Sequence, residues 1–161
     1  KKNIGYEKSL DRGFKYIKKK KFQIFVTYDA DNQFFIKDLK RIIKLLLIGN
    51  DIIVGKRHKF QRPSEYIVNF FSSFFLKIYD PLCGLKGYNI RVIKQSNYFD
   101  KNSYSGTELL FNSVSNNLKL KQINIRTKSR LGETRFGSSL TTEIHLMRII
   151  IIILKTFLKK K

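Results

Sequence analysis

The stretch FQIFVTYDADNQ, residues 22–33, places an apolar run directly before a cluster of polar side chains. Residues 22–28 are rich in aromatic and β-branched side chains, which predicts a short strand. The polar residues 29–33 predict a loop after that strand. In α/β sheets ligands bind beyond the carboxyl ends of the strands, so this loop is the first candidate for a binding site.

The segments on either side of this stretch alternate between helical and extended patterns. Residues 5–19 have apolar side chains at helical spacing, and residues 35–48 repeat that spacing. Residues 51–55 form a second apolar, β-rich run. The order helix, strand, helix, strand predicts an α/β fold in which parallel neighbouring strands are covered by helices.

The remaining chain continues the alternation and ends on a basic helix. We expect helices at 64–78, 107–118 and 143–158 and strands at 83–89 and 121–126. The Phe-rich residues 64–78 are expected to pack in the core against the sheet. The last helix is too short to span a bilayer, which takes about 20 residues. Its apolar run and basic end predict a helix lying on an anionic membrane surface.

Composition limits the class of protein. The chain has 161 residues, 33 Lys plus Arg against 12 Asp plus Glu, a net charge of +21 and one Cys. The length suits one domain, and a single Cys excludes a disulfide framework. The charge fits nucleic acid, an anionic membrane or a polyanionic substrate, but codon bias in an AT-rich genome, which enriches Lys, also produces it. No nucleic-acid-binding signature is present, so we expect no nucleic acid partner.

Two kinds of side chain are candidates for chemistry. Asp29, Asp31 and Gln33 offer oxygen ligands to a hard cation such as Mg²⁺ or Mn²⁺, although an Asx-type turn has the same pattern. Arg57 follows the second strand, and Arg62 lies in a loop-like segment. Arginine forks bind phosphate in a bidentate way, so these are candidate phosphate contacts.

An ordered set of motifs resembles glycosyltransferase family 2, in its polyprenyl-phosphate sugar transferase (dolichyl-phosphate mannose synthase-like) branch. The segments that carry the resemblance are NIGY at 3–6, DADNQ at 29–33, DIIVGKR at 51–57, DPLCGLKGY at 80–88, GTELL at 106–110 and RLGETRFG at 130–137. The resemblance implies a GT-A-like fold, which is a mixed, mostly parallel sheet with helices on both faces. It also implies transfer of a sugar from a nucleoside-diphosphate donor with inversion, here to a polyprenyl phosphate.

The resemblance assigns roles to particular residues. Asp29, Asp31 and Gln33 would hold the metal ion, and Asp31 would be essential for transfer. The residues expected at the donor diphosphate or the acceptor phosphate are Asp29, Arg57, Arg62, Arg130 and Thr134, the last standing where the branch usually has Ser. A lipid phosphate needs no general base. A sugar hydroxyl of a surface polysaccharide or glycolipid needs one, and Glu108 is the candidate, although a first-turn Glu also stabilises a helix dipole.

The family normally begins with strands that lie before the NIGY segment. We therefore expect residues 1–140 to be the carboxyl-terminal portion of a GT-A domain that lacks its first βαβ portion. Residues 141–161 are expected to form the basic, apolar helix at the cytoplasmic membrane face. Three alternatives remain: a glycosyltransferase acting on a sugar hydroxyl, an inactive fragment of such an enzyme, and, most distant, a basic nucleic-acid-binding module.

Overall fold

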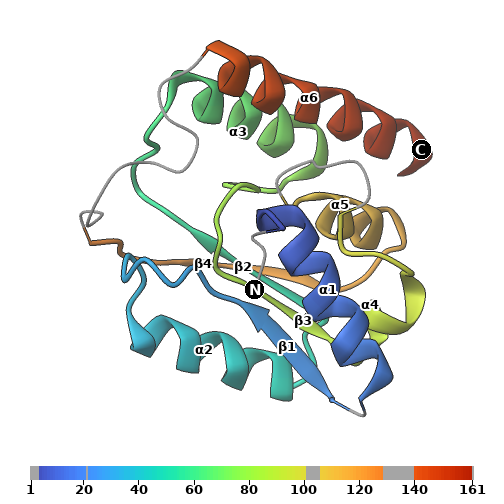
Figure 1. The fold of residues 1–161 in the computed structure, drawn as a ribbon. Helices are drawn as coiled ribbons and strands as arrows, with labels where there is room; N and C mark the ends of the chain where they lie inside the picture. The colour runs from blue at the N-terminus through green and yellow to red at the C-terminus, as the bar shows by residue number, and fades with distance from the viewer. Residues whose placement is uncertain (1–3, 21, 101–105, 129–139, 161) are drawn as a thin grey trace.

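The computed structural model describes residues 4–20, 22–100, 106–128 and 140–160. Within these residues, helices alternate with the strands of one sheet (Figure 1). The elements are α1 (Tyr6–Lys19), β1 (Ile24–Thr27), α2 (Ile36–Leu47), β2 (Ile52–Lys56), α3 (Pro63–Leu76), β3 (Lys86–Asn89), α4 (Ile90–Gln95), α5 (Glu108–Ser115), β4 (Leu120–Asn124) and α6 (Leu140–Lys160).

The strands form a mixed sheet in the order β1-β3-β2-β4. β3 pairs antiparallel with both β1 and β2, whereas β2 pairs parallel with β4. Three strands therefore run in one direction and β3 runs in the other, which agrees with a mixed, mostly parallel sheet. The prediction that β1 and β2 are neighbours is wrong, because β3 lies between them.

Helices cover both faces of the sheet, as predicted (Figure 1). On one face, Ile42 and Leu46 of α2 pack with Ile53 of β2. On the other face the remaining helices contribute to a larger cluster, in which Phe14 of α1 packs with Ile52 of β2. Successive side chains of a strand point to opposite faces, which is why Ile52 and Ile53 belong to different clusters.

Every predicted helix and strand is present, with ends displaced by three residues or fewer. The sequence pattern missed α4, which follows β3 without a loop. Asn89 caps this helix, because its side-chain Oδ1 accepts a hydrogen bond from the Arg91 N–H at 3.1 Å. Six residues are too few to show a helical period, so the pattern carried no signal for this helix.

α3 and α6 run side by side and form an outer layer above the rest of the fold (Figure 1). The Glu143 carboxylate accepts a hydrogen bond from the Ser64 N–H at 3.2 Å, which joins the two helices at their starts. The prediction that residues 64–78 pack in the core is wrong for the outer side of α3, where Phe70 is 62% and Phe74 is 63% exposed. Within the described residues, no helix combines the length and the apolar character needed to cross a membrane.

Candidate active site

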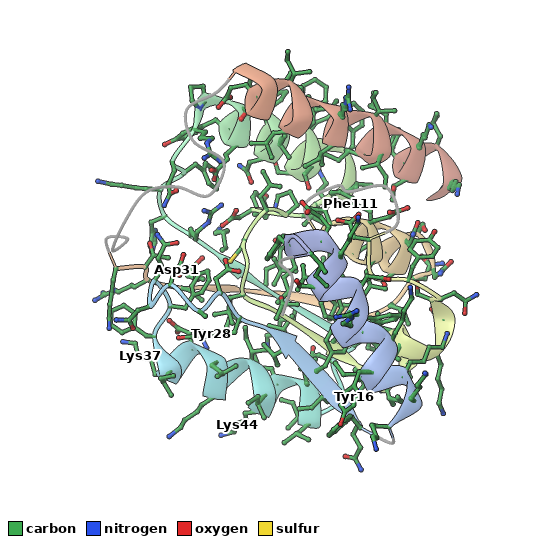
Figure 2. All side chains as sticks on the ribbon, viewed as in Figure 1. Tyr16, Tyr28, Asp31, Lys37, Lys44 and Phe111 are labelled. Carbon is green, nitrogen blue, oxygen red and sulfur yellow. The ribbon has the colours of Figure 1, made fainter. Side chains whose placement is uncertain are left out.

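The loop that follows β1 carries the predicted metal ligands, and Figure 2 labels Asp31 among them. Asp31 Oδ1 accepts a hydrogen bond from the Gln33 N–H at 3.2 Å, so the Asx-type turn is present. The Tyr28 hydroxyl donates to the Phe34 carbonyl oxygen at 2.8 Å and closes the loop. Asp29 and Asp31 are both half-buried. A carboxylate has about four lone-pair sites, so the turn is compatible with metal binding by the same side chain.

The far end of this loop is fixed to the segment after β4. Phe34 forms an isolated antiparallel bridge with Thr127, and the Lys128 N–H donates to the Gln33 carbonyl oxygen at 2.9 Å. The loop is therefore held by β1 at one end and by residues 127–128 at the other. This anchoring defines where the two carboxylates lie.

Gly84 makes room for the Asp29 side chain. A Cβ atom on Gly84 would lie 1.9 Å from Asp29 Oδ2, which is closer than real Cβ atoms approach another heavy atom. The Thr27 hydroxyl donates to the Gly84 carbonyl oxygen at 2.8 Å, so the end of β1 and the glycine are held together. Any side chain larger than hydrogen at this position would displace the carboxylate.

A buried lysine lies close to the same carboxylate. Lys86, the first residue of β3, is 3% exposed. Burial lowers the pKa of Lys86 below its ordinary value, and the neighbouring Cys83, Asp80 and Asp29 act in the opposite direction. The site therefore contains a buried amine whose charged form burial disfavours.

Arg57 is held by protein carboxylates. Its Nε donates to Asp80 Oδ2 and its Nη2 to Asp80 Oδ1, each at 2.8 Å, and Nη2 also donates to Glu65 Oε2 at 2.8 Å. The Arg57 N–H donates to Asp80 Oδ2 at 2.9 Å. Burial lowers the pKa of Arg57, but the hydrogen bond and the charge of Asp80 raise it by more, so the net pKa lies above the ordinary value.

These contacts show a structural role for Arg57, whereas the predicted phosphate contact stays a prediction. Two carboxylates already neutralise the guanidinium, and its side chain is only 14% exposed. A direct phosphate contact would require the arginine to leave a bidentate pair. The structure instead shows Arg57 connecting the end of β2 to the loop before β3 and to the first turn of α3.

The other predicted site residues are spread over the fold. Arg62 is half-buried and directly precedes α3. Glu108 opens α5 and is 4% exposed, so it has little contact with solvent. Arg130 and Thr134 lie outside the described residues.

Charged groups of both signs lie around the loop after β1. Asp29 and Asp31 belong to the loop itself, and the Lys37 and Lys128 ammonium groups lie 5.3 and 4.9 Å from the centroid of the Phe35 ring at its end. Asp80 and Glu65 are paired with Arg57. No group of three or more His, Cys, Asp or Glu suited to a metal is found among the described residues.

A two-carboxylate site fits some metal ions better than others. Mg²⁺ is usually held by one or two carboxylates together with water and substrate phosphates, whereas structural zinc needs a closed shell of protein ligands. Asp29 and Asp31 supply two carboxylates, and Gln33 lies at the end of the same turn. The residues present therefore fit Mg²⁺ or Mn²⁺ that shares its coordination with a ligand.

The sequence pattern did not assign roles to Asp80, Gly84 and Lys86. All three lie in the segment DPLCGLKGY, which the family resemblance had singled out as a motif. The motif is therefore the one signal in the sequence that these three residues belong to the site. Nothing in the sequence alone shows that Asp80 pairs with Arg57 or that Gly84 contacts Asp29.

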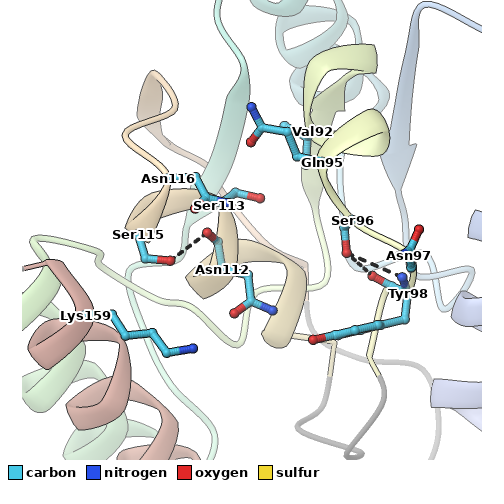
Figure 3. A pocket seen from close by; sticks show the side chains of 10 residues that line it. All are labelled: Val92, Gln95, Ser96, Asn97, Tyr98, Asn112, Ser113, Ser115, Asn116 and Lys159. Carbon is cyan, nitrogen blue, oxygen red and sulfur yellow. Dashed lines mark hydrogen bonds between the residues drawn. The ribbon is translucent and has the colours of Figure 1, made fainter.

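A separate cavity of about 520 Å³ lies between α4 and α5 (Figure 3). Amide and hydroxyl side chains dominate its lining, with Gln95, Asn97 and Asn112 among them, and Lys159 reaches it from α6. None of the predicted site residues lines this cavity.

Of three kinds of comparison between this chain and known proteins, only the comparison with solved structures finds a match. No family model matches it, and no curated protein matches it in sequence. Solved structures do match. One is glucosyl-3-phosphoglycerate synthase from Mycobacterium tuberculosis in complex with phosphoglyceric acid, with a TM-score of 0.68 and 14% identity over 97% of this chain and 56% of that chain.

Two further complexes of that mycobacterial enzyme give similar values. The complex with Mn²⁺, UDP-glucose and glycerol 3-phosphate has a TM-score of 0.69 and 13% identity over 96% of this chain and 55% of that one. The complex with Mn²⁺, UDP and phosphoglyceric acid has a TM-score of 0.71 and 12% identity over the same shares. The chain thus spans about half the length of these structures, and the likeness shows that its fold is GT-A-like.

Proposed function

We propose that this chain is part of a metal-dependent inverting glycosyltransferase that uses a nucleoside-diphosphate sugar as donor. The observation that carries the proposal is the pair Asp29 and Asp31 at the carboxyl end of β1, with Gly84 making room for the first of them. That pair lies in a GT-A-like fold, and similar solved structures contain Mn²⁺ and UDP-glucose. The proposed cofactor is Mg²⁺ or Mn²⁺.

The chemistry of the proposed reaction explains the residues. Cleavage of the anomeric C–O bond leaves negative charge on the departing diphosphate, and a bound divalent cation would stabilise that charge. Asp29 and Asp31 would hold the cation, and Gly84 would keep Asp29 in position. Arg57, through Asp80, positions the segment that contains Gly84.

A phosphate-bearing acceptor agrees best with the environment of Glu108. A phosphate oxygen is already an anion and needs no base, whereas a sugar hydroxyl needs an accessible carboxylate. Glu108 is 4% exposed, which counts against the second alternative. We propose a polyprenyl phosphate as acceptor, on the resemblance of residues 130–137 and on the apolar surface of α3 and α6. Action at the cytoplasmic membrane face is part of this proposal.

A small phosphorylated acceptor is the second candidate. The observation that favours it is that similar solved structures contain glycerol 3-phosphate or phosphoglyceric acid. The two candidates differ in the lipid tail and share the phosphate. A transfer assay with UDP-glucose and Mn²⁺ separates them, because it can compare a short polyprenyl phosphate with glycerol 3-phosphate as acceptor.

The metal site can be tested without turnover, since the chain spans half of the similar structures. Titration of the ¹⁵N-labelled chain with Mn²⁺ should broaden the amide signals of residues 28–33 before others. Asp31→Asn should remove this effect and leave the rest of the spectrum unchanged. The control is Asp11→Asn, because Asp11 lies in α1, where its carboxylate pairs with Lys15 at 2.6 Å and accepts a hydrogen bond from the Phe99 N–H that an amide oxygen can also accept. Equal broadening in wild type and Asp31→Asn would contradict the proposal.

A further inference from the structure

The outer side of α3 is apolar. Tyr66, Ile67, Phe70 and Phe74 are exposed, and their spacing places them on one side of the helix. The inner side contains smaller or polar residues, with Ser64, Glu65, Val68, Ser72 and Leu76 buried there. Phe71 and Phe75 pack against the core, so α3 partly buries two of its four Phe rings and exposes the other two, Phe70 and Phe74.

α6 has a similar apolar stripe along its outer side. The exposed residues follow one another at alternating steps of three and four: Ile144, Met147, Ile151, Leu154 and Leu158. Ile151 is 51% and Leu158 is 69% exposed. Leu146, Ile149 and Ile153 lie on the opposite side of the helix and are buried in the core. The outer stripe is thus additional to the residues that attach α6 to the protein.

Aromatic contacts connect the two helices. Phe157 of α6 contacts Phe75 of α3 with ring centroids 5.0 Å apart, and Phe75 stacks on Phe71 at 6.1 Å. Phe71 contacts Phe70, which stacks on Phe74 at 6.2 Å. A continuous row of rings therefore runs from α6 to the exposed side of α3. We call the exposed apolar residues of the two helices together the α3–α6 face.

Among the described side chains of α3 and α6, the exposed charged ones are cations. Arg148, Lys155 and Lys159 are exposed on α6 beside its apolar stripe. α3 and α6 contain one acidic residue each. Glu65 is buried against Arg57, and the Glu143 carboxylate accepts a hydrogen bond from Ser64. The face therefore combines exposed apolar side chains with a positive border.

We propose that the α3–α6 face docks on an anionic lipid bilayer, with both helices lying in the plane of the interface. Apolar side chains beside a row of Lys and Arg are the pattern by which helices bind such surfaces. A second copy of this chain fits less well, because two faces bordered by cations in chains of charge +21 would repel each other. This proposal deepens the membrane part of the proposed function by naming the docking face, and the docking itself requires no catalysis.

Docking on this face would bring the candidate active site close to the lipid. The first turn of α3 contains Glu65, which binds Arg57, and Arg57 binds Asp80 in the loop before Gly84. One helix therefore contributes to both the docking face and the structure that positions Asp29. This consequence rests on the proposed function, because it concerns how a lipid phosphate reaches the site.

The test is co-sedimentation with two kinds of vesicle. One kind contains only neutral phosphatidylcholine, and the other also contains roughly 30 mol% anionic phosphatidylglycerol, whose negative surface charge attracts basic segments. The intact chain should bind the anionic vesicles and bind neutral ones far less. Phe70→Gln with Phe74→Gln should lower partitioning at least about tenfold, because two exposed rings lose their insertion. The control is Ile36→Gln with Leu47→Gln, which removes apolar side chains that are 57% and 62% exposed on α2.

Several outcomes would overturn the proposal. One is failure of the intact chain to bind anionic vesicles, and another is equal loss in the α3 and α2 variants. The third outcome comes from gel filtration. If the chain binds no vesicles but forms a dimer, and the Phe70 and Phe74 substitutions dissociate that dimer, the occupant of the face is a second copy of the chain. Asp31→Asn should bind vesicles as the wild type does, so failure of the metal site and failure of docking are distinguishable. Circular dichroism should show the α3 and α2 variants folded, since each of their substituted side chains is exposed.

Discussion

Replacing Gly84 with alanine tests the candidate metal site at its tightest point. The added Cβ would lie 1.9 Å from Asp29 Oδ2 and 2.5 Å from its Cγ. An ordinary contact begins at 3.4 Å, so the carboxylate would have to move by about 1.5 Å. Asp29 is half-buried and can rotate towards solvent, so we expect a cost in folding free energy of only about 1–3 kcal/mol. The larger effect should fall on metal binding.

The expected loss follows from the role of Gly84 as a support for a ligand. Removing a group that orients a metal ligand weakens metal affinity by roughly 10- to 100-fold. In a ¹⁵N-labelled chain, the Mn²⁺ concentration that broadens residues 28–33 should rise by that factor in Gly84→Ala. In an active enzyme, transfer should fall by about 100-fold, because a carboxylate misplaced by about 1 Å loses that much rate.

A second glycine provides the control. Gly13 lies inside α1, and a Cβ there would meet no atom within 4 Å. Gly13→Ala should stabilise the fold by about 0.5–1 kcal/mol through lower backbone entropy, with no change in the response to Mn²⁺. The reasoning is refuted if Gly84→Ala folds and its residues 28–33 broaden at the same Mn²⁺ concentration as in the wild type.

Two further predictions concern the buried residues around this site. Asp80→Ala should cost about 3–5 kcal/mol in urea unfolding, because it leaves the Arg57 guanidinium buried with one partner fewer. Lys15→Ala removes an exposed side chain from an ion pair in α1 and should change stability by less than about 1 kcal/mol. Burial, and then Asp80, raise the pKa of Cys83 to about 12, so iodoacetamide at pH 9 should leave the native thiol unmodified and react rapidly after unfolding. The unfolded chain loses this proton first, so the Cys83 contribution to stability should decline as pH rises from about 9 to about 12. Rapid native alkylation would contradict the burial of Cys83.

Local patterns in the sequence predicted the elements but not their partners. Apolar spacing located α2, because burial on one side of a helix leaves a period in the sequence, and an unbroken apolar run located β2, which is buried on both faces. The place of β3 between β1 and β2 leaves no such trace, since pairing depends on residues far apart in the chain. Ile24, for example, pairs with Asn89.

In the candidate site, too, the sequence shows individual residues but not their partners in the fold. Asp29 and Asp31 stand out from the sequence, because two carboxylates follow an apolar strand. Arg57 also stands out by its place after β2, but its contacts with Asp80 and Glu65 depend on the folded chain. The aromatic content of residues 64–78 predicts burial, because aromatic side chains are buried on average. Which side of a helix faces the core depends on its neighbours in the fold, so the exposure of Phe70 and Phe74 could not be predicted.

The antiparallel strand β3 has a consequence for how the chain folds during synthesis. Among the described residues, β1 pairs in the sheet only with β3, which lies some sixty residues later in the sequence. A nascent chain that ends before Lys86 therefore lacks the partner that attaches β1 to the sheet. Gly84, against which Asp29 rests, arrives in the same late segment. The loop with the two aspartates is thus made early but gains its folded position only after β3 has left the ribosome.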